Sequence, residues 1–110
     1  MSQLSGLPPL PAAVHFVGIG GIGMSGLARI LQTWGYTVSG SDAFPSQLVD
    51  QLQEEGIPVT IGHEDVSRAQ SADLIVATAA LRPTNTELQA ARQANIPIVK
   101  RAELLGMLMN

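Results

Sequence analysis

A glycine-rich turn between an apolar strand and an amphipathic helix is the feature that most restricts the fold of this chain. Residues 14–17 (VHFV) predict a buried strand, and residues 18–23 (GIGGIG) follow it directly in the pattern G-x-G-x-x-G. Beyond the turn, four apolar side chains recur at helical spacing, namely Leu27, Ile30, Leu31 and Trp34. A strand, a glycine turn and a helix in this order are typical of the first unit of a Rossmann-like fold.

The junction between a helix and a strand recurs along the chain. Gly35, Gly56 and Asn95, residues that accept the left-handed conformation at a helix end, each precede a short apolar strand. A fourth strand is expected at 74–77. Between the strands, the sequence predicts an amphipathic segment around 48–52 and a helix that is capped by Asn85, with Leu88 and Ala91 facing inward. The alternation predicts an α/β fold, a Rossmann-like doubly wound, mainly parallel sheet of about five strands with helices on both faces.

The length of 110 residues fits a single domain, and 45% hydrophobic against 14% charged residues suits a sheet covered by helices. Residues 1–13 contain three prolines, so we expect a flexible N-terminal arm there and a nucleotide-binding domain over residues 14–110. The segment 102–109 has the pattern of a helix whose continuation lies in a longer parent chain.

Charge and composition exclude several kinds of partner. The net charge is −3 and Lys100 is the only lysine, so a nucleic-acid backbone is not an expected partner. No apolar stretch reaches the roughly 20 residues that cross a bilayer, and no signal peptide opens the sequence, so no membrane association is expected. The absence of cysteine fits a reducing compartment, and we expect a cytoplasmic protein.

The glycine turn predicts a binding site for a diphosphate. Gly18 would permit the tight turn, Gly20 would let the diphosphate approach the backbone, and Gly23 would let the helix pack close to the strand. The N–H groups from Gly21 through Ile22 and Gly23 to Met24 would then point at the anion, where the helix dipole also favours negative charge. The alternative is that the glycines only permit a tight turn.

Polar and small residues follow the other strands, at the edge where a ligand crevice is expected. Asp42 lies 19 residues after Gly23 and is placed to accept hydrogen bonds from ribose hydroxyls; the alternative is that it caps the next helix. His63 follows the third strand and is a candidate for contact with the base, with a solvated loop residue as the alternative. The fourth strand is followed by small residues and an arginine that are expected to line the crevice: Thr78, Ala79, Ala80 and Arg82.

No catalytic constellation is visible in the sequence. The chain has no G-x-x-x-x-G-K-[ST] loop, no metal-binding cluster and no nucleophile beside a base, and His15 is expected to be packed within its strand rather than catalytic. We therefore expect a binding domain with no catalytic residue, no metal and no bound cofactor.

Residues 15–28 (HFVGIGGIGMSGLA) closely resemble the opening of the bacterial UDP-N-acetylmuramate:L-alanine ligases, which belong to the Mur ligase family. Three later motifs resemble that family in the same order and at similar spacing: Ser39-Gly40-Ser41-Asp42, Gly62-His63, and residues 98–105 (IVKRAELL). The resemblance covers about residues 14–109. Thr86 departs from the family, which often has proline there, and threonine serves equally at a helix start.

The resemblance implies an N-terminal domain for the UDP part of UDP-N-acetylmuramate, with a central domain for ATP and Mg²⁺ and a C-terminal domain elsewhere in the parent enzyme. It places residues 20–24 at the diphosphate, Ser41 and Asp42 near the ribose and uracil, and His63 on the uracil side. The parent would activate the muramoyl carboxylate with ATP and join it to L-alanine, whereas this chain alone is expected to be inactive. Two alternatives stay open, an NAD-binding domain of a dehydrogenase and a nucleotide-sensing module without catalysis.

Overall fold

The computed structural model describes residues 7–78, 81–82 and 84–109, in which five strands alternate with five helices. In chain order these are β1 (Ala13–Val17), α1 (Met24–Thr33), β2 (Thr37–Asp42), α2 (Gln47–Glu54), β3 (Val59–Ile61), α3 (Ser67–Ser71), β4 (Leu74–Ala77), α4 (Thr86–Gln93), β5 (Ile98–Lys100) and α5 (Arg101–Leu108). No helix in this part of the chain has the length and apolar character needed to cross a membrane.

All strand pairs are parallel, and the order across the sheet is β3-β2-β1-β4-β5. Phe16 at the centre of β1 lies between Gly40 of β2 and Val76 of β4. The chain moves outward from β1 to β3 and then returns to the other side of β1 with β4. This reversal confirms the doubly wound fold and places a crevice beyond the carboxyl ends of β1 and β4.

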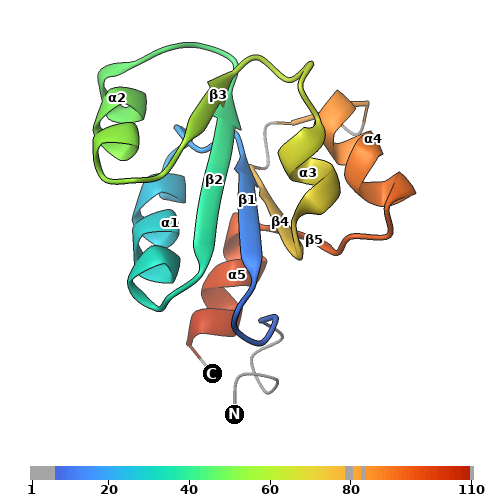
Figure 1. Ribbon diagram of the computed structural model, residues 1–110, viewed down its shortest axis with the longest axis horizontal. Coiled ribbons are helices and arrows are strands. Elements are labelled where there is room, and N and C mark those ends of the chain that lie inside the picture. Colours follow the sequence, from blue (N-terminus) through green and yellow to red (C-terminus); the bar gives the residue numbers. More distant parts are fainter. Residues whose placement is uncertain (1–6, 79–80, 83, 110) are drawn as a thin grey trace.

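Helices cover both faces of the sheet, and each face has its own apolar cluster. The larger cluster joins β1 and β2 side chains to α1, α2 and α5, through residues such as Phe16, Leu31 and Leu104. The smaller one packs Ala69 of α3 and Leu88 of α4 against the opposite face. Figure 1 shows α1 and α2 on one side of the strands and α3 and α4 on the other.

The predicted helix ends are confirmed. Asn85 caps α4, because its side-chain oxygen accepts hydrogen bonds from the N–H groups of Glu87 and Leu88 at 2.9 and 3.2 Å. Asn95 has a φ of 60° after α4, and Gly35 has a φ of 100° after α1. Each residue turns the chain from a helix into the next strand.

Three details differ from the sequence-based expectation. Ile30 and Trp34 of the first helical segment are 41% and 48% exposed, so the buried face of α1 is narrower than the spacing indicated. Helix α3 was not expected, because five residues with one buried alanine carry no periodic signal. The arm is packed from Leu7 onward, since Leu7 is only 5% exposed and the Tyr36 hydroxyl donates to the Pro8 carbonyl at 2.7 Å.

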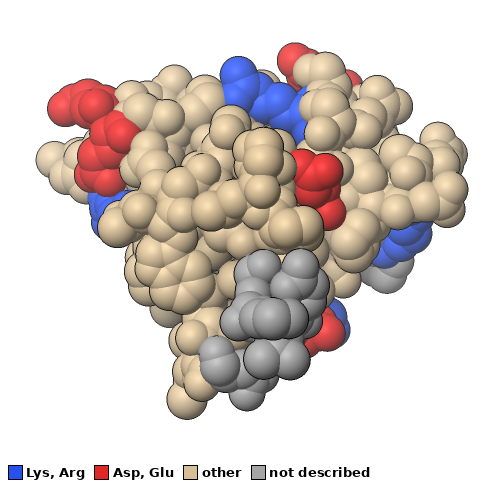
Figure 2. All heavy atoms as spheres, turned by 60° about the horizontal axis from the view of Figure 1, so that its bottom comes forward, with Lys and Arg blue, Asp and Glu red and all other residues tan. Residues whose placement is uncertain are grey.

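The surface carries scattered charge. On the face shown in Figure 2, basic side chains occur in small separate groups among a mostly uncharged surface, with acidic side chains close to them. This face therefore offers no continuous basic area to a polyanion.

Gly40 of β2 lies unusually close to the glycine turn. A Cβ at this position would be 2.5 Å from Cδ1 and 2.8 Å from Cβ of Ile19, which is fully buried. The Cβ of Ile19 is fixed by the backbone of the turn, and the rest of its side chain is packed within the larger apolar cluster. The absence of a side chain at Gly40 is thus a requirement of the fold.

We predict that Gly40→Ala lowers the free energy of unfolding by about 1 to 3 kcal/mol, the usual cost of forcing extra volume into a packed core. The matched control is Gly26→Ala within α1, where a Cβ would meet nothing within 4 Å. Because alanine restricts the unfolded chain and favours helix, Gly26→Ala should raise stability by about 0.5 to 1 kcal/mol. Urea unfolding followed by circular dichroism measures both changes, and equal stabilities of Gly40→Ala and the parent would contradict the packing argument.

Candidate functional site

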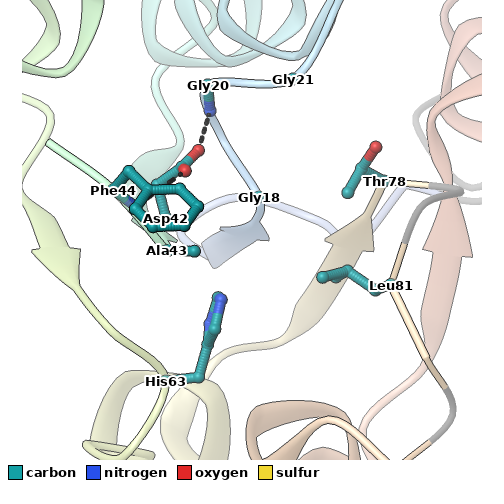
Figure 3. A pocket seen from close by; sticks show the side chains of 9 residues that line it. All are labelled: Gly18, Gly20, Gly21, Asp42, Ala43, Phe44, His63, Thr78 and Leu81. Carbon is teal, nitrogen blue, oxygen red and sulfur yellow. Dashed lines mark hydrogen bonds between the residues drawn. The ribbon is translucent and has the colours of Figure 1, made fainter. Parts of the chain in front are cut away.

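A pocket of about 300 Å³ opens at the carboxyl ends of the central strands. Figure 3 shows side chains and backbone from four strand ends converging on it. Its lining residues are Gly18, Gly20, Gly21, Asp42, Ala43, Phe44, His63, Thr78 and Leu81. The structure therefore brings together the glycine turn, Asp42, His63 and Thr78, which the sequence predicts at the site.

The glycine turn is fixed to β2 by its backbone. The N–H groups of Gly18 and Ile19 both donate to the carbonyl oxygen of Ser41 at 2.9 Å. Gly21 donates in turn to the carbonyl of Gly18 at 2.9 Å, and Met24 to the carbonyl of Gly21 at 3.1 Å. The turn is thus already ordered by hydrogen bonds within the chain.

These bonds correct the expected set of anion donors. Gly21 and Met24 were expected to direct their N–H groups at an anion, but both groups are used within the turn. Of the turn residues that the structure describes, Ile22 and Gly23 have N–H groups that donate to no protein atom. The side chains of Ile22 and Met24 differ in exposure. Ile22 is 96% exposed at the tip of the turn, whereas Met24 is fully buried in the core.

Gly20 has a structural role in addition to the one expected from the sequence. Its N–H donates to Oδ2 of Asp42 at 2.7 Å, and a Cβ at Gly20 would lie 2.6 Å from the same oxygen. The residue is therefore glycine because the Asp42 carboxylate approaches it, and not only because a ligand needs the space. This contact anchors Asp42 at the rim of the pocket, with the carboxylate pointing toward the turn (Figure 3).

Arg101, the first residue of α5, lies over the start of α1. A Cβ at Gly23 would be 3.1 Å from both Cδ and Nη1 of Arg101, and Gly23 has a φ of 77°, which other residues rarely adopt. Gly23 therefore makes room for an arginine, whereas close packing of helix on strand was expected. The guanidinium therefore lies next to Gly23, whose N–H has no protein acceptor.

Sequence reasoning did not place Arg101 at the site and proposed Arg82 for this role. Neither arginine is among the residues that line the pocket; Arg82 is exposed, whereas Arg101 lies next to Gly23 of the glycine turn. A signal for Arg101 was present, because it directly follows β5 and the carboxyl ends of parallel strands meet at one edge. Phe44 and Leu81 of the lining were also missed, and Ala79 and Ala80 lie outside the described residues.

A buried glutamate of α4 lies behind the pocket. Glu87 is 1% exposed; its Oε1 accepts a hydrogen bond from Nε2 of His15 at 2.8 Å. Its Oε2 accepts from the Ser41 hydroxyl and from Nδ1 of His63, the latter at 2.5 Å. His15 is confirmed as packed, with Nδ1 at 2.7 Å from the Ser39 hydroxyl.

The pKa of Glu87 reflects two opposed effects. Burial raises the pKa of this carboxyl, but hydrogen bonds from His15, Ser41 and His63 outweigh burial and bring the pKa below its ordinary value. Glu87 also lies in the first turn of α4, where the helix dipole favours a negative charge. The side chain is therefore an ionised carboxylate at neutral pH. Sequence reasoning missed it, because His15 and Glu87 are 72 positions apart.

Among the described residues, no group of three or more His, Cys, Asp or Glu side chains is arranged to hold a metal ion.

We predict that Glu87→Gln changes the acid sensitivity of folding. A carboxyl whose folded pKa is lowered contributes stability above its unfolded pKa of about 4.5, and that stability is lost as the pH falls through the lower folded pKa. The variant should lose about 1 to 3 kcal/mol at pH 7, because buried donors lose part of their acceptor. Between about pH 5 and pH 3 its unfolding free energy should fall less steeply than that of the parent.

The control is Glu55→Gln, which removes an exposed carboxyl paired with Arg29 at 2.6 Å. Its pKa is also lowered, by the hydrogen bond from Arg29, but the pair is on the surface, where such pairs contribute little. Urea unfolding at several pH values compares the two variants. Parallel pH profiles for Glu87→Gln and the parent would show that the carboxylate does not carry this stability.

A family model described as Mur ligase family, catalytic domain, matches residues 13–110. The UDP-N-acetylmuramate--L-alanine ligase of Lachnoclostridium phytofermentans is 50% identical over 99 residues, which are 90% of this chain and 21% of that protein. The ligase of the same name from Rhodopseudomonas palustris strain TIE-1 is 50% identical over 103 residues, 94% of this chain and 22% of that protein. The chain spans about a fifth of the length of these curated relatives.

Solved structures show the same similarity to the ligases. The UDP-N-acetylmuramate-alanine ligase of Thermotoga maritima superposes with a TM-score of 0.80 at 35% identity, over 86% of this chain and 22% of that one. A cinnamyl alcohol dehydrogenase of Sorghum bicolor reaches a TM-score of 0.57 at 17% identity, over 99% of this chain and 40% of that one, and shows a likeness of fold alone. Because the family model covers nearly the whole chain and two ligases share half of the aligned residues, the chain belongs to the Mur ligase family.

Proposed function

We propose that this chain binds the uridine diphosphate part of UDP-N-acetylmuramate for a cytoplasmic, ATP-dependent ligase that joins L-alanine to that substrate in peptidoglycan synthesis. The relatives at 50% identity carry the name of that ligase. The observation that carries the proposal is the pocket itself, where the glycine turn and the ends of β2, β3 and β4 meet around a cleft of about 300 Å³. That volume lies at the small end of the range for ligand pockets.

The diphosphate is assigned to the glycine turn at the start of α1, next to the part of the turn that lines the pocket. The N–H groups of Ile22 and Gly23 have no protein acceptor, and the Arg101 guanidinium lies next to Gly23. Each charge-assisted hydrogen bond contributes about 1.5 to 3 kcal/mol, and the helix start adds about 0.3 to 1 kcal/mol. Two such N–H groups and one arginine suffice to hold a diphosphate without a lysine.

The nucleoside is assigned to the opposite end, beside β2 and β3. Asp42 is held by Gly20 and retains lone pairs that can accept hydrogen bonds from ribose hydroxyls. His63 and Phe44 line the same end and offer flat rings to a base. The charge of Asp42 also repels an additional phosphate on the ribose, so a 2′-phosphorylated nucleotide is disfavoured.

In the complete enzyme, ATP and Mg²⁺ bound by another domain would supply the activation of the muramoyl carboxylate. The residues of this chain would bind and orient the UDP end, so that the carboxylate is presented at a fixed distance from the nucleotide. By itself the chain is proposed to bind UDP without turning over ATP or alanine.

We predict that UDP perturbs the amide resonances of Ile22 and Gly23 more than NAD does at equal concentration. The pocket has one anion-binding end and one carboxylate end, which suits a single nucleoside diphosphate. A titration followed by amide NMR measures both ligands on the same sample. Larger shifts with NAD would favour the dehydrogenase alternative, with which the fold is also compatible.

We further predict that Arg101→Gln raises the Kd for UDP about tenfold or more, the loss expected for a charge-assisted hydrogen bond. Arg82→Gln tests the residue that the sequence favoured and should change the Kd less than twofold. Arg29→Gln, which breaks a surface pair with Glu55, serves as the matched control for loss of positive charge. Calorimetric titration measures all three, and equal effects of Arg101→Gln and Arg29→Gln would remove Arg101 from the site.

A further inference from the structure

The two ring nitrogens of His63 have different surroundings. Nδ1 lies 2.5 Å from Oε2 of Glu87 and 3.3 Å from the Ser41 hydroxyl oxygen. Figure 3 shows the ring pointing into the pocket, with a nitrogen at the end farthest from the backbone. That nitrogen is Nε2, because Nδ1 is attached to the carbon that joins the ring to the chain. Nδ1 thus faces the buried Glu87 carboxylate, and Nε2 faces the pocket.

The contact with Glu87 decides where the hydrogen of His63 lies. An ionised carboxylate has only acceptor positions, so the short contact requires a hydrogen on Nδ1. The Ser41 hydroxyl donates to the same Oε2, which leaves its oxygen lone pairs for Nδ1 and is consistent with the same arrangement. In a neutral imidazole with hydrogen on Nδ1, Nε2 is an acceptor.

Glu87 cannot turn away from His63. Its other oxygen, Oε1, accepts from Nε2 of His15, and His15 is held on its far side by Ser39. Its backbone N–H donates to the Asn85 side chain at 2.9 Å, which fixes the start of α4. None of the buried side-chain polar atoms in the described part of the chain lacks a partner.

We propose that Glu87, positioned by His15, fixes His63 with its hydrogen on Nδ1, so that Nε2 accepts a hydrogen bond from the N3–H of uracil and rejects cytosine. The inference rests on the proposed binding of UDP. Uracil has a hydrogen on N3, whereas cytosine has a lone pair there. A nitrogen lone pair on His63 therefore pairs with uracil and faces another lone pair in cytosine. Glu87 and His15 are positioning residues in this scheme, and His63 is the residue that touches the base.

The first experiment measures the tautomer directly. The ¹⁵N spectrum of the His63 imidazole in the 110-residue chain, recorded over a series of pH values, distinguishes hydrogen on Nδ1 from hydrogen on Nε2. We expect hydrogen on Nδ1 alone. Hydrogen on Nε2, alone or together with Nδ1, would overturn the proposal, and this test needs no variant that might fail to fold.

The second experiment measures base selectivity as the ratio of the Kd values for CDP and UDP. We expect UDP to bind about 10- to 100-fold more tightly than CDP, the range set by one mispaired buried acceptor. 3-Methyluridine diphosphate, which lacks the N3 hydrogen, should bind as weakly as CDP. In His63→Phe, which keeps a flat ring without nitrogen, the ratio should fall to within about threefold.

Glu87→Gln tests the positioning role, because an uncharged amide no longer requires a hydrogen on Nδ1. Its selectivity ratio should fall toward that of His63→Phe, while Glu55→Gln, a surface change outside the pocket, should keep the parental ratio. If the parent binds no UDP, the proposed function fails. If the parent prefers UDP over CDP and His63→Phe keeps that preference, the function stands and the inference about His63 is wrong.

Discussion

The hydrogen bonds that the Ser41 carbonyl accepts from Gly18 and Ile19 are the interaction on which the site depends. They join the glycine turn to the end of β2, so that Asp42, the next residue, reaches the turn and bonds to Gly20. The Ser41 hydroxyl also donates a hydrogen bond to Glu87 on the opposite face of the sheet. Ser41 thus couples the glycine turn to the buried carboxylate behind it.

The buried carboxylate brings a cost and a benefit. An ionised group away from water is expensive unless it is fully hydrogen-bonded, and three side chains supply the bonds to Glu87. Those side chains come from β1, β2 and the loop after β3, whereas Glu87 comes from α4. These hydrogen bonds therefore fix the position of α4 relative to the sheet. Apolar contacts alone would tolerate small shifts of the helix, whereas hydrogen bonds to a charge do not.

Local patterns in the sequence predicted the order of the elements, the helix ends and the strand edge that carries the pocket. They did so because each signal, an apolar run or a glycine at a turn, lies within a few residues. Glu87 and Arg101 were missed because their roles depend on residues 72 and 78 positions away, His15 and Gly23. The contact of Gly20 with Asp42 was missed for the same reason, since the two residues are 22 positions apart.

The charges near the pocket bear on how the proposed ligand would lie there. The N–H groups of Ile22 and Gly23 and the guanidinium of Arg101 make the start of α1 positive, while the Asp42 carboxylate makes the pocket rim beside β2 negative. A nucleoside diphosphate placed the other way round would bring its phosphates to Asp42 and leave the N–H groups of Ile22 and Gly23 without an acceptor. Both consequences are unfavourable in a partly enclosed site, where charges are poorly screened. The hydrogen bond from Gly20 holds the Asp42 carboxylate toward the turn, where the phosphates of a reversed ligand would meet it. The proposed orientation, with the base at His63 and the phosphates at the start of α1, is therefore the one that these charges favour, independently of the chemistry at the far end of the substrate.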